Sequence, residues 1–377
     1  MRVLQLIETG GPGGAETVFA NLATALRDRG HHVHCMVGDG SWLPAELRGR
    51  GLNTELLVPG TSADLGLLRA IRTAIRREQI DVVHAHLFDA AVYAAVASSL
   101  EGCRCVVTLH GQVDVRRSGL RTWIKRQLMR ANADVVVVVS EALRRDIASV
   151  LHLPSDKLRV VPNGVQQAPS SSATEPMFQH QPDDAPKRVV AVGNIRRPKN
   201  YPLLLEAFSL VRRELPHTLL EIVGEEDRDG LYESLCARAA QPDLDGAVQF
   251  HGFVPDPQSV LRGADTFVLA SLQEGFSLAT IEAMLAGVPV VATRSGGPEE
   301  IVKDGTTGLL VPVNDAVSLA SSLVRVLNDR AFARTLAVAA DADARTRFSM
   351  DAMVNRYLRI YEGRLEQLPR SSRGPAA

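Results

Sequence analysis

Two acidic residues, Glu274 and Glu282, stand eight positions apart in the segment 271–290. Glu274 follows an apolar run at 266–270 that is typical of a buried strand, and Gly275 marks a loop there. Glu282 lies in the segment 278–285, whose apolar residues recur at helical spacing. We therefore expect one acid at the carboxyl end of a strand and the other on the next helix, which is where ligands bind in α/β sheets.

A glycine-rich loop follows the first apolar run of the chain. The residues Gly10 to Gly14 come directly after the run at 3–7 and open a predicted helix. Glycine lets the backbone approach a ligand closely, and the N–H groups at a helix N-terminus attract an anion such as phosphate. Glu16 stands where a dinucleotide fingerprint needs its third glycine, and no Gly-Lys-Ser/Thr occurs in the chain. A tight strand–helix turn without a ligand is the alternative.

A second candidate anion site follows the apolar run at 188–192. Asn194, Arg196 and Lys199 lie in the loop that leads from this run into a predicted helix. Arginine and lysine are the natural partners of a diphosphate, so the loop is a candidate phosphate clamp. An exposed basic loop that binds nothing is the alternative.

Three histidines lie at the ends of predicted strands. His84 and His86 follow the run at 81–83, and His110 follows the run at 105–109. Strand ends in a parallel sheet face the ligand crevice, which makes these side chains candidates for the site. A histidine that only hydrogen-bonds within the fold is the alternative, which we weigh equally for His84. No spacing among the three favours a zinc site.

Short apolar runs alternate with longer amphipathic segments along the whole chain, which predicts an α/β fold with doubly wound parallel sheets. The predicted strands are 3–7, 33–37, 54–57, 81–83, 105–109, 135–139 and 159–161 in the first half, and 188–192, 219–223, 248–251, 266–270, 289–292 and 309–311 in the second. Two such series predict two Rossmann-like domains, at 1–165 and 188–348. The polar segment 166–187 predicts a linker or mobile loop, and 367–377 predicts a disordered tail.

The bulk properties exclude several classes of protein. The chain has 377 residues, enough for two cores, and its 42 basic and 43 acidic residues leave no reason to expect nucleic acid as a partner. Residues 1–165 carry a net charge of +4 and the remainder −5. Four irregularly spaced cysteines do not make a disulfide framework. Neither a signal peptide nor an apolar stretch of ~20 residues is evident, so we expect a cytoplasmic protein.

These motifs, in this order, resemble the glycosyltransferases of family 4, which are retaining enzymes with the two-domain GT-B fold. The resemblance covers nearly the whole chain outside the linker and tail. It implies a nucleotide-sugar donor, with UDP-sugar preferred over GDP- or ADP-sugar, no cofactor and no metal. It also implies that a last helix, at 349–366, packs back on the N-terminal domain.

The resemblance also implies roles for individual residues. His110 and Glu274 would lie beside the transferred sugar, and Glu282 would bind the ribose hydroxyls. Asn194 stands where the family has an arginine, so Arg196 would take over that charge. The other implied donor contacts are Gly13, Gly14, Lys199, Gly252, Phe253, Val254, Gly275, Phe276, Ser277 and Leu278, and the implied acceptor side comprises His84, His86, Arg116 and Arg117.

A basic helix is predicted next to the acceptor side. Residues 116–130 carry six basic side chains and no acid, interleaved with Leu120, Trp123, Ile124 and Leu128. Such a helix can lie on an anionic membrane, as a peripheral contact on the inner face of the cell membrane. The alternative, which we place slightly ahead, is a helix whose apolar stripe packs on the sheet while its charges face water.

The sequence therefore predicts a retaining glycosyltransferase that moves a sugar from a nucleotide-sugar to a glycan or lipid-linked acceptor, in cell-surface or exopolysaccharide biosynthesis. A GT-B epimerase or phosphorylase is one alternative, and a nucleotide-sugar-binding protein with a silent site is another. Paired carboxylates also suit a glycoside hydrolase, but such an enzyme needs no phosphate cradle in each of two domains.

Overall fold

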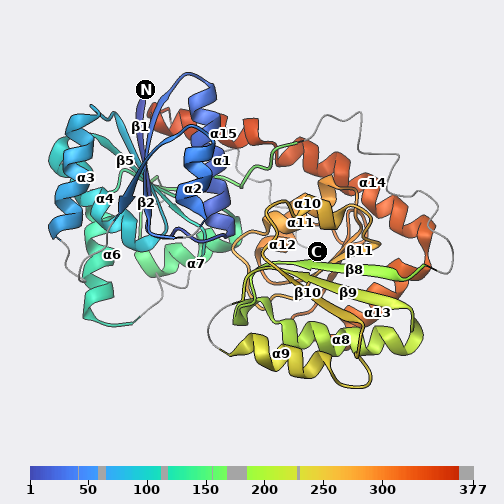
Figure 1. Cartoon of the computed structure of the whole chain (residues 1–377). Helices are drawn as coiled ribbons and strands as arrows, with labels where there is room; N and C mark the ends of the chain where they lie inside the picture. Colours follow the sequence, from blue (N-terminus) through green and yellow to red (C-terminus); the bar gives the residue numbers. More distant parts are fainter. Residues whose placement is uncertain are drawn as a thin grey trace.

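The structure is a computed structural model that describes residues 1–40, 42–57, 65–111, 118–154, 156–167, 185–226 and 230–364. Most of the predicted linker at 166–187 and all of the predicted tail at 367–377 lie outside the described residues. The rest forms two parallel sheets, one in each half of the chain, and helices cover both faces of each sheet (Figure 1). The predicted α/β fold with two Rossmann-like halves is confirmed.

The N-terminal sheet has the strand order β3-β2-β1-β4-β5-β6-β7. Its strands are β1 Arg2–Ile7, β2 His32–Gly38, β3 Asn53–Leu57, β4 Val82–His86, β5 Arg104–Leu109, β6 Val135–Val138 and β7 Leu158–Val160. The helices of this half are α1 Gly14–Asp28, α2 Leu43–Gly49, α3 Leu65–Arg77, α4 Phe88–Glu101, α6 Leu120–Asn132 and α7 Glu141–Leu151. Apolar side chains of α1 and α2 fill one face of the sheet, and those of α3, α4 and α7 fill the other.

The C-terminal sheet has the strand order β10-β9-β8-β11-β12-β13. Its strands are β8 Lys187–Val192, β9 Thr218–Val223, β10 Val248–Gly252, β11 Thr266–Leu269, β12 Val290–Thr293 and β13 Leu309–Val311. The helices are the 3-10 turn η2 Arg197–Lys199, α8 Tyr201–Glu214, α9 Leu231–Ala239, α10 Gln258–Leu261, α11 Leu278–Leu285, α12 Gly297–Ile301, α13 Ala316–Asn328, α14 Arg330–Arg347 and α15 Met350–Tyr361.

Each of the predicted strands is present, with ends that agree or differ by at most three residues. The apolar runs located them because a parallel strand is buried on both faces and reads as a continuous apolar segment. The largest difference concerns β4, which was predicted to end at 83 and extends to His86. His84 and His86 therefore lie inside the strand rather than beyond it, and neither side chain is exposed.

In both sheets the strand order reverses beside the first strand of the half. β1 lies between β2 and β4, and β8 lies between β9 and β11. Such a switch point opens a crevice at the carboxyl ends of the central strands, where ligands of α/β proteins bind. The glycine loop follows β1, the Lys199 loop follows β8 and the Glu274 loop follows β11. The topology thus places the predicted loops at the two switch points.

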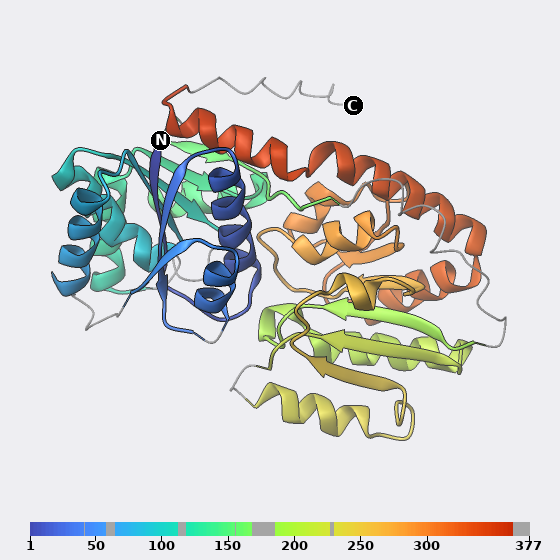
Figure 2. The same cartoon turned by 45° about the horizontal axis from the view of Figure 1, so that its top comes forward.

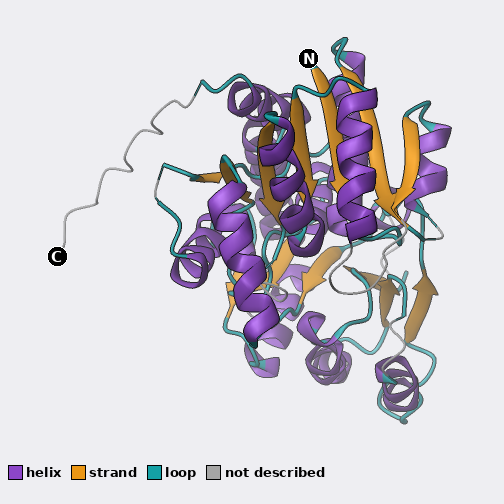
Figure 3. Cartoon of the chain, turned by 90° about the vertical axis from the view of Figure 1, so that its left-hand side faces the viewer, coloured by secondary structure: helices purple, strands orange, loops and turns teal. Residues whose placement is uncertain are grey.

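The last helix returns to the N-terminal half. Helix α14 packs on the C-terminal half, whereas α15 packs on α1 and β5 of the N-terminal half (Figures 1 and 2). Met353, Tyr357 and Tyr361 of α15 are buried there. Where the two helices meet, the backbone N–H of Val165 donates to the carbonyl of Phe348 at 2.9 Å. The chain therefore crosses between the halves twice, and the two crossings lie side by side. Figure 3 shows the helices that flank the N-terminal sheet from another side.

Candidate functional site

The two halves touch through the backbone at the predicted active centre. A Cβ built on Gly275 would lie 2.2 Å from the carbonyl oxygen of His110, so the loops after β11 and β5 meet with no room for a side chain. Phe276 and Leu278 next to it pack against the cores of both halves. The structure thus brings the Glu274–Leu278 segment and His110 together, although they lie more than 160 residues apart in the sequence.

The glycine loop packs closely against the segment 38–40, and glycines on both segments make this approach possible. A Cβ on Gly10 or Gly40 would collide with the backbone of the other segment, and one on Gly38 would meet the carbonyl of Glu8 at 2.0 Å. Helix α1 begins at Gly14 after the extended Gly13, and the Leu278 side chain lies 3.8 Å from the Cβ position of Gly14. The free N–H groups of this helix N-terminus therefore face the C-terminal half, where an anion would be favoured.

Asn194, which stands in place of the expected arginine, bridges the two halves. Its side-chain amide donates to the carbonyl of Pro12 in the glycine loop at 2.9 Å, and its oxygen accepts the N–H of Glu225 at 3.1 Å. Arg196, the predicted substitute for the missing charge, is exposed and lies just before η2. No pattern in the sequence indicates that Asn194 contacts the other half.

Lys199 and Glu274 form an ion pair at the switch point of the C-terminal sheet. Glu274 also accepts the Ser271 hydroxyl at 2.8 Å, and the backbone of Glu274 is fixed by bonds to Ser295 and Gly297 of the following loop. The predicted phosphate cation and the predicted sugar-side acid are thus direct partners. In this state each neutralises the other, and an incoming anion would compete with Glu274 for the ammonium group.

Glu282 lies on α11, a helix capped by Ser277, whose hydroxyl accepts the N–H of Thr280 at 3.3 Å. Burial and, to a smaller extent, the nearby Asp256 raise the pKa of Glu282 to about 7. Desolvation without a cation partner has this effect on a carboxyl group. A ligand that donates hydrogen bonds to Glu282 would favour the carboxylate and reverse part of the shift.

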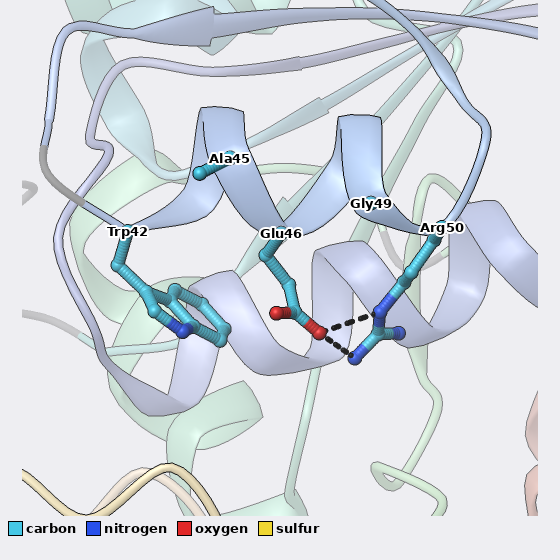
Figure 4. A pocket seen from close by; sticks show the side chains of 5 residues that line it. All are labelled: Trp42, Ala45, Glu46, Gly49 and Arg50. Carbon is cyan, nitrogen blue, oxygen red and sulfur yellow. Dashed lines mark hydrogen bonds and ion pairs between the residues drawn. The ribbon is translucent and has the colours of Figure 1, made fainter.

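Phe253 meets an aromatic residue of the other half that the sequence analysis did not identify. Gly252 ends β10 with a φ of 66°, and Phe253 beyond it is 37% exposed. The rings of Phe253 and Trp42 lie edge to face, with centroids 6.2 Å apart. A cavity of about 480 Å³ beside α2 is lined by Trp42, Ala45, Glu46, Gly49 and Arg50 (Figure 4). No predicted site residue lines this cavity.

The three histidines form a row in which His84 and His86 are fully buried. His84 has both ring nitrogens bonded, to the Tyr361 hydroxyl at 2.6 Å and the Thr108 hydroxyl at 2.7 Å. His84, which is predicted on the acceptor side with a structural role as the equal alternative, has a ring that fastens α15 to the sheet. Desolvation lowers its pKa to about 3.

His86 is also fully buried and bonds to His110 rather than lying open on the acceptor side. His110 is half-buried, and desolvation lowers its pKa to about 4. Arg116 and Arg117, the other predicted acceptor-side residues, lie outside the described residues.

Two further carboxylates bind helix N-termini, and no sequence motif marks either contact. Glu8 directly follows β1, and its carboxylate accepts the N–H groups of Asp89 and Ala90 at the start of α4. Burial raises the pKa of Glu8 to about 7. Glu300 on α12 accepts the N–H groups of Glu141 and Ala142 at the start of α7, at 2.9 and 2.7 Å. The second contact joins the two halves through a helix N-terminus.

The basic helix corresponds to α6, and its apolar residues face outwards. Leu120, Trp123, Ile124 and Leu128 are 73%, 55%, 43% and 40% exposed, and within α6 only Met129 is buried. The alternative that we placed slightly ahead, with the apolar stripe on the sheet, is therefore wrong. The sequence showed that the helix is amphipathic but not which face turns inwards.

Over the described ranges, no helix is long and apolar enough to cross a membrane. Within the same residues, no group of three or more His, Cys, Asp or Glu side chains is arranged to hold a metal ion.

Comparisons with known proteins agree with this geometry. The family model "Glycosyltransferase Family 4" matches residues 12–168, and "Glycosyl transferases group 1" matches residues 186–329. The chain is 29% identical over 367 residues to a phosphatidyl-myo-inositol mannosyltransferase of Mycobacterium leprae, with 93% of each chain covered. It is 26% identical over 365 residues to the N-acetyl-alpha-D-glucosaminyl L-malate synthase of Bacillus anthracis, again with 93% of each covered.

A solved structure of HepE from Anabaena, in complex with UDP and glucose, superimposes with a TM-score of 0.83 at 23% identity. The match covers 96% of this chain and 100% of that one, and it assigns the GT-B fold. With both halves matched by successive family models and the two sheets arranged as in GT-B structures, the chain belongs to the family 4 (group 1) glycosyltransferases.

Proposed function

We propose that the protein transfers a sugar from a UDP-sugar, with retention of anomeric configuration, to a glycan or lipid-linked acceptor of the cell surface. The convergence of the glycine loop, Lys199 and Glu274 at two facing switch points is the observation that carries the proposal. UDP is the first choice of donor nucleotide because HepE was solved with UDP and with UDP-glucose. Residues 188–348 would bind the donor and residues 1–165 the acceptor.

In the proposed reaction, negative charge builds up on the leaving diphosphate. Lys199 and Arg196 stabilise it from the C-terminal half, and the N-terminus of α1 at Gly13 and Gly14 does so from the other half. Lys199 leaves Glu274 as the phosphate enters, and this frees the carboxylate to accept a hydroxyl of the sugar. Glu282 accepts the ribose hydroxyls, and the backbone from Gly252 to Val254 lies at the base.

The experiment is a calorimetric titration with UDP-, GDP- and ADP-glucose, combined with an assay for release of the nucleoside diphosphate. Lys199→Met removes the cation, and Lys303→Met is the matched control because Lys303 is ion-paired with Asp343 away from the site. We expect tight binding of UDP-glucose that falls at least tenfold in Lys199→Met only. Binding without release in the presence of cell-surface acceptors would favour the silent protein, and turnover without any acceptor would favour an epimerase or phosphorylase.

We also propose that α6 docks on an anionic membrane and presents the active site to a lipid-linked acceptor. Its exposed apolar residues lie between basic ones, and α6 contains no acid. Apolar side chains can enter the headgroup region while the flanking cations meet lipid phosphates, which suits an anionic bilayer and no neutral one. The mannosyltransferase relatives carry the name of a membrane lipid, phosphatidyl-myo-inositol, in agreement with such an acceptor.

Vesicle flotation tests this part of the proposal. The protein should float with vesicles that contain phosphatidylglycerol at low salt, and not with pure phosphatidylcholine vesicles. A Leu120→Ser, Trp123→Ser double variant should lose this binding. Val317→Ser with Val338→Ser is the control, because these residues are 66% and 54% exposed on the C-terminal half. Equal flotation of both double variants would contradict the assignment to α6.

A further inference from the structure

The ring of His86 is buried among three other rings. His86 is the last residue of β4 and pairs in register with Thr108 of β5, two positions before His110. The His110 ring stacks on it with centroids 5.3 Å apart, the His84 ring lies at 4.3 Å, and Phe19 of α1 meets it edge-on at 5.2 Å. Its side chain has no solvent-accessible surface.

One hydrogen bond connects His86 to His110. Nδ1 of His86 and Nε2 of His110 lie 3.0 Å apart, and no acid takes part. Burial holds the pKa of both imidazoles below the usual value, so both rings are neutral at pH 7. A neutral imidazole carries one N–H, and only one proton can lie between the two nitrogens. Either His86 donates from Nδ1, or His110 donates from Nε2.

The far side of the His86 ring decides between these two arrangements. Its Nε2 is buried and has no hydrogen-bond partner among the residues that the structure describes. If His110 were the donor, the proton of His86 would lie on Nε2 as a buried N–H without an acceptor, with at most a weak contact to the Phe19 ring. If His86 is the donor, only a lone pair is left unpaired, and buried orphan donors are rarer in proteins than orphan acceptors.

We infer that His86 is a positioning residue that donates from Nδ1 to Nε2 of His110 and thereby fixes the proton of His110 on Nδ1. The inference deepens the proposed function, since it rests on His110 lying beside the transferred sugar. The ring of His110 then offers the substrate an N–H donor and no lone pair. His110 can hold a sugar or phosphate oxygen through that N–H, but in this tautomer it cannot accept a proton from the acceptor.

Hydrogen bonds between α15 and the sheet hold the neighbouring His84 ring in place. The Tyr357 hydroxyl lies 3.1 Å from the Thr108 hydroxyl, and the Tyr361 hydroxyl lies 2.6 Å from Nδ1 of His84. These bonds fix the His84 ring against which His86 packs. The last helix of the chain therefore supports the histidine stack, whereas the His86 to His110 bond sets the tautomer.

Two variants separate the hydrogen bond from packing. The side-chain amide of His86→Asn can donate from the place of Nδ1, whereas His86→Leu fills a similar volume without a donor. Tyr361→Phe is the control, because it disturbs His84 and leaves the His86 to His110 bond in place. Each variant is compared in thermal unfolding, in kcat and donor KM, and by nitrogen-15 NMR of labelled histidines in the protein without substrate.

The NMR spectrum should show His110 protonated on Nδ1 in the native protein and in His86→Asn, and a mixture of tautomers in His86→Leu. We expect kcat to fall roughly 10- to 100-fold in His86→Leu with little change in KM, in the range of other groups that orient a functional side chain, and a smaller loss in His86→Asn. Protonation of native His110 on Nε2 would overturn the inference, as would equal kcat losses in the two variants. The tautomer is read without turnover, so failure of the proposed function would leave this measurement intact.

Discussion

Replacing Gly275 with alanine should open the enzyme at its predicted active centre without unfolding it. The added Cβ would lie 2.2 Å from the carbonyl oxygen of His110, and real Cβ atoms essentially never approach below 3.0 Å. The three nearest atoms all belong to His110 and Gly111 of the other half, and they are backbone atoms that cannot rotate away. The halves must therefore separate by at least about 0.8 Å at this point, the shortfall from that limit.

A displacement of this size is large for catalysis and small for folding. Misplacing reacting groups by about 1 Å can cost roughly 100-fold in rate, so we expect a loss of this order in kcat for Gly275→Ala. Each half keeps its own core, and the φ of Gly275 is one that alanine can adopt. The unfolding free energy should change by less than about 1 kcal/mol, in the range of substitutions that create no cavity or buried polar group.

The assay combines the rate of nucleoside diphosphate release, urea unfolding and small-angle X-ray scattering. Gly49→Ala on α2 is the control, because its Cβ would meet nothing within 4 Å. Gly275→Ala should give a larger radius of gyration than the native protein, and Gly49→Ala should not. The reasoning is refuted if Gly275→Ala transfers sugar at the native rate, or if it loses stability by several kcal/mol and so disturbs the C-terminal half itself.

Three further predictions follow from the titrating and buried groups. Since the carboxylate of Glu282 would accept ribose hydroxyls and its pKa is raised to about 7 in the free protein, donor affinity in calorimetry should increase up to roughly tenfold from pH 6 to pH 8, and Glu282→Gln should bind weakly with no such dependence. His84 binds a proton in the unfolded chain below pH ~6.5 but in the native state only below about 3. The unfolding free energy from urea titrations should therefore decrease as the pH is lowered from ~6.5 to about 3, by up to roughly 5 kcal/mol for this residue, and His84→Gln should give a flatter profile. Tyr361→Phe should lower the unfolding free energy by about 1–3 kcal/mol because it leaves a buried nitrogen of His84 unpaired, and an unchanged urea midpoint would contradict this.

The sequence predicts the strands well and the ends of polar strands poorly. Apolar runs such as 105–109 and 135–139 coincide with β5 and β6 to within one residue, because burial on both faces leaves an unbroken signal. In β4 the run breaks at His84, and the two histidines look like residues beyond the strand. His84 is bonded to Tyr361, which lies 277 positions later, and no local pattern contains that information.

For the site, glycines and charges in loops are predictable and contacts between the halves are not. Lys199 and Glu274 were identified from loop position, and topology brings them together. Asn194 looks like the loss of a charge in the sequence, yet it holds Pro12 across the interface. The orientation of α6 was missed because an amphipathic pattern gives the angle between the faces, and only the packing of neighbouring elements determines which one is covered.

The return of α15 to the first sheet has a consequence for synthesis on the ribosome. Thr108 and His84 leave the ribosome early, and their hydroxyl partners on Tyr357 and Tyr361 follow 249 and 277 residues later. At 5–20 residues per second, that interval is about 12 to 55 seconds. Until the whole C-terminal half has been translated, the N-terminal sheet therefore lacks the cover of α15 on the side of α1, and His84 and Thr108 lack their tyrosine partners. The first half should consequently need its own last helix, supplied in the same chain or as a separate peptide, to be produced as a stable fragment.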